Sequence, residues 1–218
     1  MMTKNVLILA ANGQIARLVE QRILTEDAFA EVKLTLFLRN ASRLQDLQDN
    51  PRVTLVEGDI TDADAVSAAM IDQDLVFVAV VDHDRQNRLT KNVIAGMQTH
   101  QVARVVFTNV LGLYNEVGGE FGRWNLEMIG AGMAPARQSD QLLADSGLDY
   151  TTLRLPWLND RDIKYTVTTK EQPYDGVSGS RRSVADVVLN IIADPTQYSR
   201  DSIGIADPAT EGQDRPVY

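Results

Sequence analysis

The 218-residue sequence contains no cysteine, which excludes disulfide bonds and thiol chemistry. Histidine is scarce as well, with only His83 and His100, and we expect no metal site. No apolar run approaches the length of a membrane span, and the start lacks the basic, apolar and cleavage regions of a signal peptide. These absences lead us to expect a cytoplasmic protein that does not bind membranes.

Basic residues are fewer than acidic ones. The sequence has 21 Lys and Arg and 30 Asp and Glu, which gives a formal net charge of −9. This charge argues against nucleic-acid partners, since nothing offsets the repulsion of phosphates. Apolar residues at 44% and charged residues at 23% are typical of globular proteins, and the length suits one well-buried domain. We expect a small-molecule substrate and leave a homo-oligomer open.

The most informative segment that is present is a glycine turn within residues 6–16. A short β-branched apolar run leads into the turn, and a helical pattern follows directly. Such a turn directs backbone N–H groups and the positive end of a helix at a phosphate. In the spacing G-x-x-G-x-x-G, Ala10, Gly13 and Ala16 hold the three positions. We expect a negative φ at Ala10 and the closest approach to a pyrophosphate at Gly13. The alternative is a buried strand and helix without a ligand.

Strands and helices alternate along the first 155 residues. We expect a capping box at Thr61–Asp64, a helix after Pro135, a later helix capped by Ser183, and loose order only over Asp207–Tyr218. This alternation indicates βαβ units and a parallel sheet covered on both faces, which is a doubly wound α/β fold. The expected strands are Asn5–Ala10, Lys33–Leu38, Val53–Glu57, Leu75–Val80, Arg104–Asn109 and Tyr150–Leu155, with short ones at Lys164–Thr169 and Ser202–Ala206.

Arg39 follows the second expected strand, where an NAD-specific site would have an acidic residue on the ribose. Its planar guanidinium can bind a 2′-phosphate through two hydrogen bonds or stack on adenine, and Arg43 is close enough to help. The alternative for both arginines is the beginning of an exposed helix. We favour the phosphate interpretation for Arg39, which indicates NADP(H) in preference to NAD(H).

Other strand ends add polar or small residues at the same edge of the sheet. Within 57–60 a carboxylate can accept from the adenine amino group, and the residue after it offers its backbone N–H. Ala79 and Val80 are small enough to leave room for a ribose, while Thr108 can face a nicotinamide or a substrate. Ligands of open α/β sheets lie beyond the carboxyl ends of the strands, which is where all these residues fall.

These motifs resemble those of atypical short-chain dehydrogenase/reductases of the NAD(P)H-binding group, which includes flavin-reductase-like and NmrA-like proteins. The resemblance rests on Ala10–Ala16, Leu38–Asn40, Glu57–Ile60 and Ser146–Pro156, and Arg182–Val188 is similar to the family's late helix. It implies a Rossmann-type NAD(P)-binding domain over 1–218, with a core over 1–156 and substrate-side elements over 157–218. The expected cofactor-binding residues are Ala11, Asn12, Gly13, Gln14, Ile15, Arg39, Asn40, Arg43, Asp59, Ile60, Ala79, Val80, Thr108, Asn109 and Pro156.

The catalytic pair of the larger family is missing. In Tyr-x-x-x-Lys the lysine lowers the pKa of a tyrosine that acts as acid or base, and no tyrosine here has a lysine four residues later. Tyr150 and Arg154 have that spacing but lie inside an expected strand, and residues 134–140 contain no lysine. We therefore do not expect carbonyl reduction that depends on a Tyr/Lys proton donor.

Thr108 and Tyr114 remain as catalytic candidates, Thr108 to orient an acceptor or carboxamide and Tyr114 because it follows the fifth strand. A surface position is the alternative for Tyr114. The run 82–84 (Asp-His-Asp) suggests a metal or a proton relay, but a solvated polar loop is the stronger interpretation. The apolar, glycine-punctuated segment 121–133 lines a substrate pocket with Trp157, forms a subunit contact or belongs to the core, and the sequence does not rank these three.

The sequence therefore favours an NADPH-binding oxidoreductase that passes hydride to a quinone, a flavin or another small electrophilic acceptor. Such acceptors need little acid help from the protein, which holds and orients the cofactor. A non-catalytic NAD(P) sensor that changes its affinity for a protein partner is the alternative. Sugar-nucleotide modification is disfavoured, because the Tyr/Lys pair and a larger substrate domain are both missing.

Overall fold

The computed structural model describes residues 5–218 of the chain. Within this range the main sheet contains β1 (Asn5–Leu9), β2 (Lys33–Leu38), β3 (Val53–Glu57), β4 (Leu75–Val78), β5 (Arg104–Val110), β6 (Asp149–Leu155), β8 (Thr166–Thr168) and β10 (Asp201–Ala206). A separate pair consists of β7 (Trp157–Asn159) and β9 (Ser178–Ser180). The helices are α1 (Gln14–Thr25), α2 (Ala63–Ala69), α3 (Arg88–His100), α4 (Gly119–Asp145) and α5 (Arg181–Ala193), with 3₁₀ turns η1 (Asp27–Phe29), η2 (Ala41–Leu47) and η3 (Pro208–Thr210).

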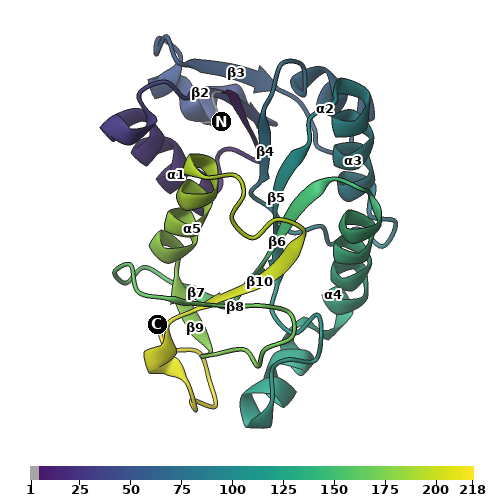
Figure 1. Cartoon of the computed structure of the whole chain (residues 1–218), viewed down its shortest axis with the longest axis vertical. Helices are drawn as coiled ribbons and strands as arrows, with labels where there is room; N and C mark the ends of the chain where they lie inside the picture. Colours follow the sequence, from purple (N-terminus) through teal and green to yellow (C-terminus); the bar gives the residue numbers. More distant parts are fainter. Residues whose placement is uncertain (1–4) are drawn as a thin grey trace.

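The strand order of the main sheet is β3-β2-β1-β4-β5-β6-β10-β8, and all neighbours are parallel except β10 and β8. Helices α1 and α5 cover one face, and α2, α3 and α4 cover the other (Figure 1). The chain builds outward from β1 to β3 and then returns to add β4 on the opposite side of β1. This reversal opens a crevice between the carboxyl ends of β1 and β4, where doubly wound folds bind ligands.

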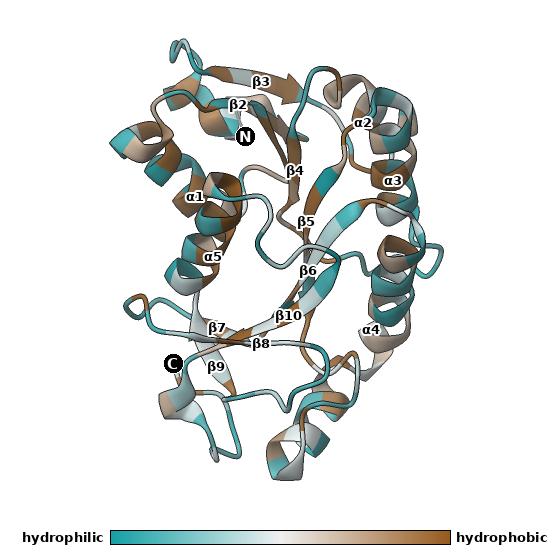
Figure 2. Ribbon diagram, viewed as in Figure 1, coloured by the Kyte–Doolittle hydropathy of each residue, from teal (hydrophilic) through white to brown (hydrophobic). Residues whose placement is uncertain are grey.

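The core lies on both faces of the sheet, which explains why the central strands are continuously apolar. In β1, Val6 and Ile8 pack into the apolar cluster under α1 and α5, whereas Leu7 and Leu9 pack into the cluster under α2 and α3. All four side chains are completely buried. Figure 2 shows the hydrophobic residues along β4, beside β1, and on the inner sides of the flanking helices. The doubly wound α/β fold predicted from the sequence is confirmed.

Two strand ends differ from the expected ones at the crevice. Strand β1 ends at Leu9 because Ala10 takes a φ of 62°, so the expectation of a negative φ at Ala10 is wrong. Strand β4 ends at Val78, two residues earlier than expected, so Ala79 and Val80 follow the strand.

Helix α4 begins at Gly119 and contains Pro135, so the expectation of a helix that starts after this proline is wrong. A proline inside a helix removes one backbone donor and disturbs the preceding turn. Here two side chains from outside the helix bind its carbonyls: Asn87 donates to the Pro135 oxygen at 2.9 Å, and Asn109 donates to the Ala136 oxygen at 3.0 Å. These bonds attach α4 to the beginning of α3 and to the end of β5.

Two helix caps are also displaced from the expected residues. Ser180, not Ser183, caps α5, because its hydroxyl accepts from the Ser183 N–H at 2.9 Å. Asp62, not Thr61, caps α2, since its carboxylate accepts from the N–H groups of Asp64 and Ala65. In both helices the cap lies within three residues of the predicted one. Several polar residues near each helix start can act as a cap, and the sequence does not say which of them does.

Residues after Pro156 add strands to the main sheet and a helix to one of its faces. β10 pairs with β6, and α5 packs against α1. The expectation of loose order over 207–218 is wrong, because Val217 donates its N–H to the Ser178 hydroxyl at 2.8 Å and accepts from the Asn159 side chain at 2.9 Å. Among residues 5–218, no helix has the length and apolar character needed to cross a bilayer.

Candidate functional site

The turn between β1 and α1 forms a potential anion site. Gly13 is the N-cap of α1, its N–H donates to the Ala10 oxygen at 3.0 Å, and the Ala11 N–H donates to the Phe37 oxygen at 3.1 Å. No side chain among the described residues caps this helix, and its first turn contains no acidic residue. The first N–H groups of α1 and its positive end are therefore available to a phosphate.

Three backbone segments converge at Gly13. A β-carbon at this position would lie 3.3 Å from the Ala10 oxygen and 3.6 Å from the Ala79 oxygen. Ala79 is held there by its N–H, which donates to the Leu9 oxygen at 3.1 Å. Glycine thus keeps the floor of the crevice free of side chains where β1, β4 and α1 meet. Asn12 and Gln14 are exposed on either side of it, whereas Ala11 and Ile15 are buried.

Arg39 lies at the end of β2 with its side chain exposed and without a hydrogen bond or ion pair to any described residue. Arg43 is likewise exposed in η2. Hydrogen bonds from Thr61 lower the pKa of Asp59, and the charge of Arg39 adds to this effect. Arg39 and Asp59 follow the neighbouring strands β2 and β3, close enough for their charges to interact.

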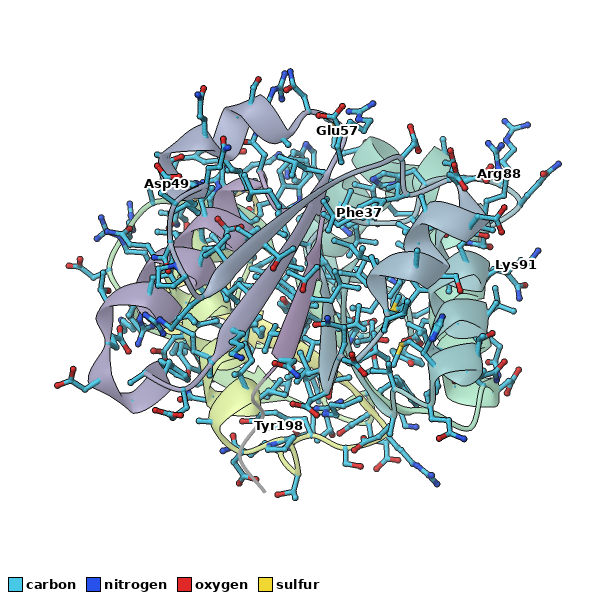
Figure 3. All side chains as sticks on the ribbon, turned by 90° about the horizontal axis from the view of Figure 1, so that it is seen from above. Phe37, Asp49, Glu57, Arg88, Lys91 and Tyr198 are labelled. Atoms are coloured by element: carbon cyan, nitrogen blue, oxygen red, sulfur yellow. The ribbon has the colours of Figure 1, made fainter. Side chains whose placement is uncertain are left out.

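The segments at the ends of β2 and β3 are joined by a hydrogen bond and by close packing. The Asn40 side chain caps η2 by accepting from the Ser42 N–H at 3.1 Å, so it is already engaged. Glu57 accepts from the Ala41 N–H at 2.9 Å. A β-carbon at Gly58 would lie 2.5 Å from the buried Phe37 ring, which requires glycine at the exit of β3. Figure 3 shows Glu57 at the rim and Phe37 further inside the fold.

Two polar residues at the end of β5, Thr108 and Asn109, differ in their hydrogen bonds. Thr108 is buried, and its hydroxyl has no partner among the described residues. A buried hydroxyl of this kind is a candidate for contact with a ligand. Asn109 is buried too, but its side chain donates to Ala136 and accepts from the Val110 N–H at 2.8 Å. Asn109 therefore positions α4.

Two adjoining hollows lie beyond the ends of β5 and β6, and Val110 and Ile129 line both. One, of about 400 Å³, reaches Pro156 and Trp157, and the other, of about 260 Å³, reaches His83. Together we call them the acceptor groove. A larger hollow of about 770 Å³ runs along the outer side of α1 and η2.

A model of the family described as NAD(P)H-binding matches residues 10–195. The chain belongs to this NAD(P)H-binding family. A search of curated proteins gives no match.

Solved structures agree with this membership. A short-chain dehydrogenase/reductase from Veillonella parvula DSM 2008 in complex with NADP is 26% identical, covers 100% of both chains and has a TM-score of 0.90. A Rossmann-fold NAD(P)-binding family protein from Shigella flexneri is 33% identical, covers 99% of both chains and has a TM-score of 0.79. The predicted resemblance to short-chain dehydrogenase/reductases is confirmed, and the chain has an NAD(P)H-binding, oxidoreductase-type fold.

Tyr114 does not compensate for the missing Tyr/Lys pair of this NAD(P)H-binding protein. Its hydroxyl donates to Asp140 on α4, and the Arg154 guanidinium lies 5.5 Å from the centre of its ring. Tyr114 is 38% exposed, in agreement with the surface alternative. Its partial burial still raises the pKa of Tyr114 above its ordinary value, and the negative charge of Asp140 adds to the shift. The phenol is therefore held in its protonated form against α4.

The run 82–84 is a loop that fixes the beginning of α3. Asp82 is buried and accepts from the Thr90 N–H at 2.9 Å, so the solvated-loop interpretation is wrong for this residue. Asp84 is 2.6 Å from Arg88. His83 has neither carboxylate as a partner, and among residues 5–218 no group of His, Asp and Glu is arranged for a metal ion. The sequence did not indicate that His83 reaches the acceptor groove, since its neighbours there come from β5 and α4.

The segment 121–133 contributes both to the core and to the groove. Phe121 and Met133 are buried, and Ile129 lines the groove. The rings of Trp124 and Trp157 are 4.8 Å apart between centroids, close to the hollow that Trp157 lines.

Proposed function

We propose that this protein is an NADPH-dependent oxidoreductase that reduces a quinone, a flavin or another small electrophilic acceptor. The observation that carries the cofactor preference is Arg39 at the end of β2, an exposed cation without a hydrogen bond or ion pair to any described residue. A guanidinium binds a 2′-phosphate through two charged hydrogen bonds, whereas an NAD-specific site has a carboxylate there. The NADP complex of the related Veillonella protein supports the same preference.

The crevice residues fit the remaining parts of a dinucleotide. The uncapped N–H groups in the first turn of α1, which begins at Gln14, suit the pyrophosphate, and Asp59 with Ile60 suits the adenine. Ala79 and Val80 leave room for the ribose. When bound, the reduced nicotinamide supplies hydride, and the free hydroxyl of Thr108 together with Pro156 would flank it.

The choice of acceptor rests on the absence of a Tyr/Lys pair that could donate a proton to the substrate. Tyr114 is held protonated against Asp140, and no described lysine follows a tyrosine at the spacing that would lower a phenol pKa. A simple ketone needs such a donor, but a quinone or flavin is already electrophilic and takes up protons more easily after hydride arrives. The mostly apolar acceptor groove suits a planar acceptor of this kind.

The function is tested by stopped-flow oxidation of NADPH with a panel of quinones, flavins, aldehydes and ketones. We expect turnover with quinones or flavins and very little with simple ketones. Tight NADPH binding without oxidation by any acceptor above the enzyme-free rate would instead support a sensor that responds to the cofactor.

The cofactor preference is tested with the Arg39→Ala variant. Loss of a bidentate charged contact costs about 1.5–3 kcal/mol, so we expect NADPH affinity to fall about 10- to 100-fold while NADH affinity stays nearly unchanged. Titration calorimetry with both cofactors measures this. Wild-type protein that binds NADH as tightly as NADPH would disprove the role of Arg39.

A further inference from the structure

We propose that His83 is the proton donor to a quinone that binds in the acceptor groove. This assignment rests on the proposed function, because it names the acceptor and the acid on the substrate side of the same site. Its basis is the position of the imidazole at one end of an apolar surface that continues to Pro156 and Trp157.

The groove connects His83 to the expected nicotinamide position. His83 lines the smaller hollow together with Val110 and Ile129, and these two apolar residues also line the hollow that reaches Pro156. Val110 is the last residue of β5, two positions after Thr108. A planar molecule on Val110 and Ile129 therefore has the carboxyl end of β5 on one side and the imidazole on the other.

The imidazole is free to act on a ligand. Asp82 is engaged with Thr90, and Asp84 is engaged with Arg88, so neither flanking carboxylate binds the ring. No described residue forms a hydrogen bond or ion pair with the His83 side chain. Helix α4 makes room for it at Gly132, where a β-carbon would lie 3.3 Å from Nδ1. The ring is also exposed to solvent, which can return a proton to it.

The lining indicates the class of acceptor. Around the imidazole, the hollow of about 260 Å³ is formed by aliphatic and thioether side chains. The adjoining hollow of about 400 Å³ adds the indole of Trp157. The apolar groups bind an apolar ring, and in the hollow of about 260 Å³ the imidazole is the polar side chain that meets an oxygen at the edge of that ring. Histidine can donate a proton near neutral pH, which suits a quinone oxygen that becomes basic on reduction.

The chemical step is balanced as follows. The quinone gains two electrons and one proton as hydride from NADPH, which becomes NADP⁺, and so forms a hydroquinone anion. The His83 imidazolium breaks one N–H bond and gives that proton to the anionic oxygen, which completes the second O–H bond of the hydroquinone. Water then protonates the neutral imidazole, so the overall reaction consumes NADPH, quinone and one proton.

Binding is tested without turnover, because the chain has only two histidines. Histidine side chains labelled with ¹⁵N are followed by NMR while menadione is added to the full-length protein without NADPH. We expect the ring signals of His83 to shift and those of His100 to stay, since His100 is at the end of α3 with Nε2 3.1 Å from the Ser67 hydroxyl. Spectra of His83→Gln and His100→Gln assign the two rings.

Turnover provides the second readout. We expect His83→Gln to bind NADPH like wild type but to reduce menadione about 100-fold more slowly, within the range of general acid catalysis, while His100→Gln keeps wild-type turnover. The loss should shrink for quinones whose hydroquinones are more acidic, because their anions need a donor less. An effect of the same size on all quinones would indicate a structural role for His83.

The outcomes separate this assignment from the proposed function. Normal turnover by His83→Gln, or an unshifted His83 ring in a protein that reduces menadione, overturns the assignment and leaves the function intact. Absence of NADPH oxidation by the wild type with every acceptor overturns the function and the donor role together.

Discussion

Glu20 of α1 is unusual among single residues, because its carboxyl side chain is only 1% exposed. Burial raises its pKa to about 7, although Arg17 at 3.1 Å opposes the shift. One carboxyl oxygen, Oε1, has no partner among the described residues. The folded protein therefore holds a proton on Glu20 more tightly than the unfolded chain does, and the ionised form destabilises the fold.

The Glu20→Gln variant tests this linkage. Because the pKa of Glu20 is raised in the folded state, its favourable contribution is full below pH 4.5 and is lost as the pH rises to about 7. At pH 8 we expect Glu20→Gln to be more stable than wild type by about 1–3 kcal/mol, and at pH 5 we expect a much smaller difference. Urea unfolding at both pH values measures it.

The exposed Glu31 supplies the control, since Glu31→Gln should change the free energy of unfolding little at either pH. A destabilised Glu20→Gln protein at pH 8 would contradict the expectation, because it would mean that the ion pair with Arg17 outweighs the cost of burying the charge.

At the scale of elements, the regular strands were predictable and the long helix was not. Buried strands appear in the sequence as short apolar runs, so β2 and β3 have the expected bounds. The beginning of α4 lacks a clean apolar period and is rich in glycine, and Pro135 reads locally as a helix start. Two side chains that are distant in sequence, Asn87 and Asn109, donate to the Pro135 and Ala136 oxygens and hold this part of α4 in place. Local patterns do not contain this information.

The amino end of α1 is the element on which cofactor binding depends. Gly13 has a φ of −68°, which valine can adopt, so Gly13→Val should not strain the backbone itself. The valine side chain would instead fill the floor of the crevice, where its β-carbon would lie 3.3 Å from the Ala10 oxygen. We expect NADPH affinity to fall at least about 100-fold, because the pyrophosphate loses its close approach to the N–H groups.

Titration calorimetry with NADPH, together with urea unfolding, distinguishes lost binding from lost structure. Gly130→Val is a matched control, since nothing lies within 4 Å of a β-carbon at that position of α4. We expect both variants to unfold cooperatively and only Gly13→Val to lose NADPH. Normal binding by Gly13→Val would remove this turn from the proposed site.

At the scale of the whole molecule, the sequence located the site better than it assigned the chemistry. Residues after β1, β2 and β3 could be placed at one edge because parallel strands end on the same side. The contacts of Tyr114 and His83 could not be foreseen, because their neighbours come from α4, whose path was predicted wrongly. The free imidazole and the engaged phenol become visible only once α4 is in place.

Arg154 connects β6 to β8, to β10 and to the loop after β5. It is completely buried at the end of β6, 2.6 Å from Glu116 in the loop after β5, and it donates to backbone oxygens of β8 and β10 at 3.1 Å. Although burial opposes it, the hydrogen bond from Arg154 lowers the pKa of Glu116. Glu116 in turn accepts from the N–H groups of Gly112 and Tyr114, so the ion pair shapes the loop that leads to α4.

Removal of one partner of this pair should be far more costly than removal of both. Arg154→Met leaves a buried carboxylate without its cation, and we expect a loss of about 3–5 kcal/mol in the free energy of unfolding. In Arg154→Met/Glu116→Met no charge remains unpaired, so the loss should be clearly smaller than the sum of the two single variants. Urea unfolding of the four proteins completes the cycle. Additive losses would contradict the expectation, and would mean that the hydrogen bonds from Arg154 to β8 and β10, not its charge on Glu116, hold these strands to β6.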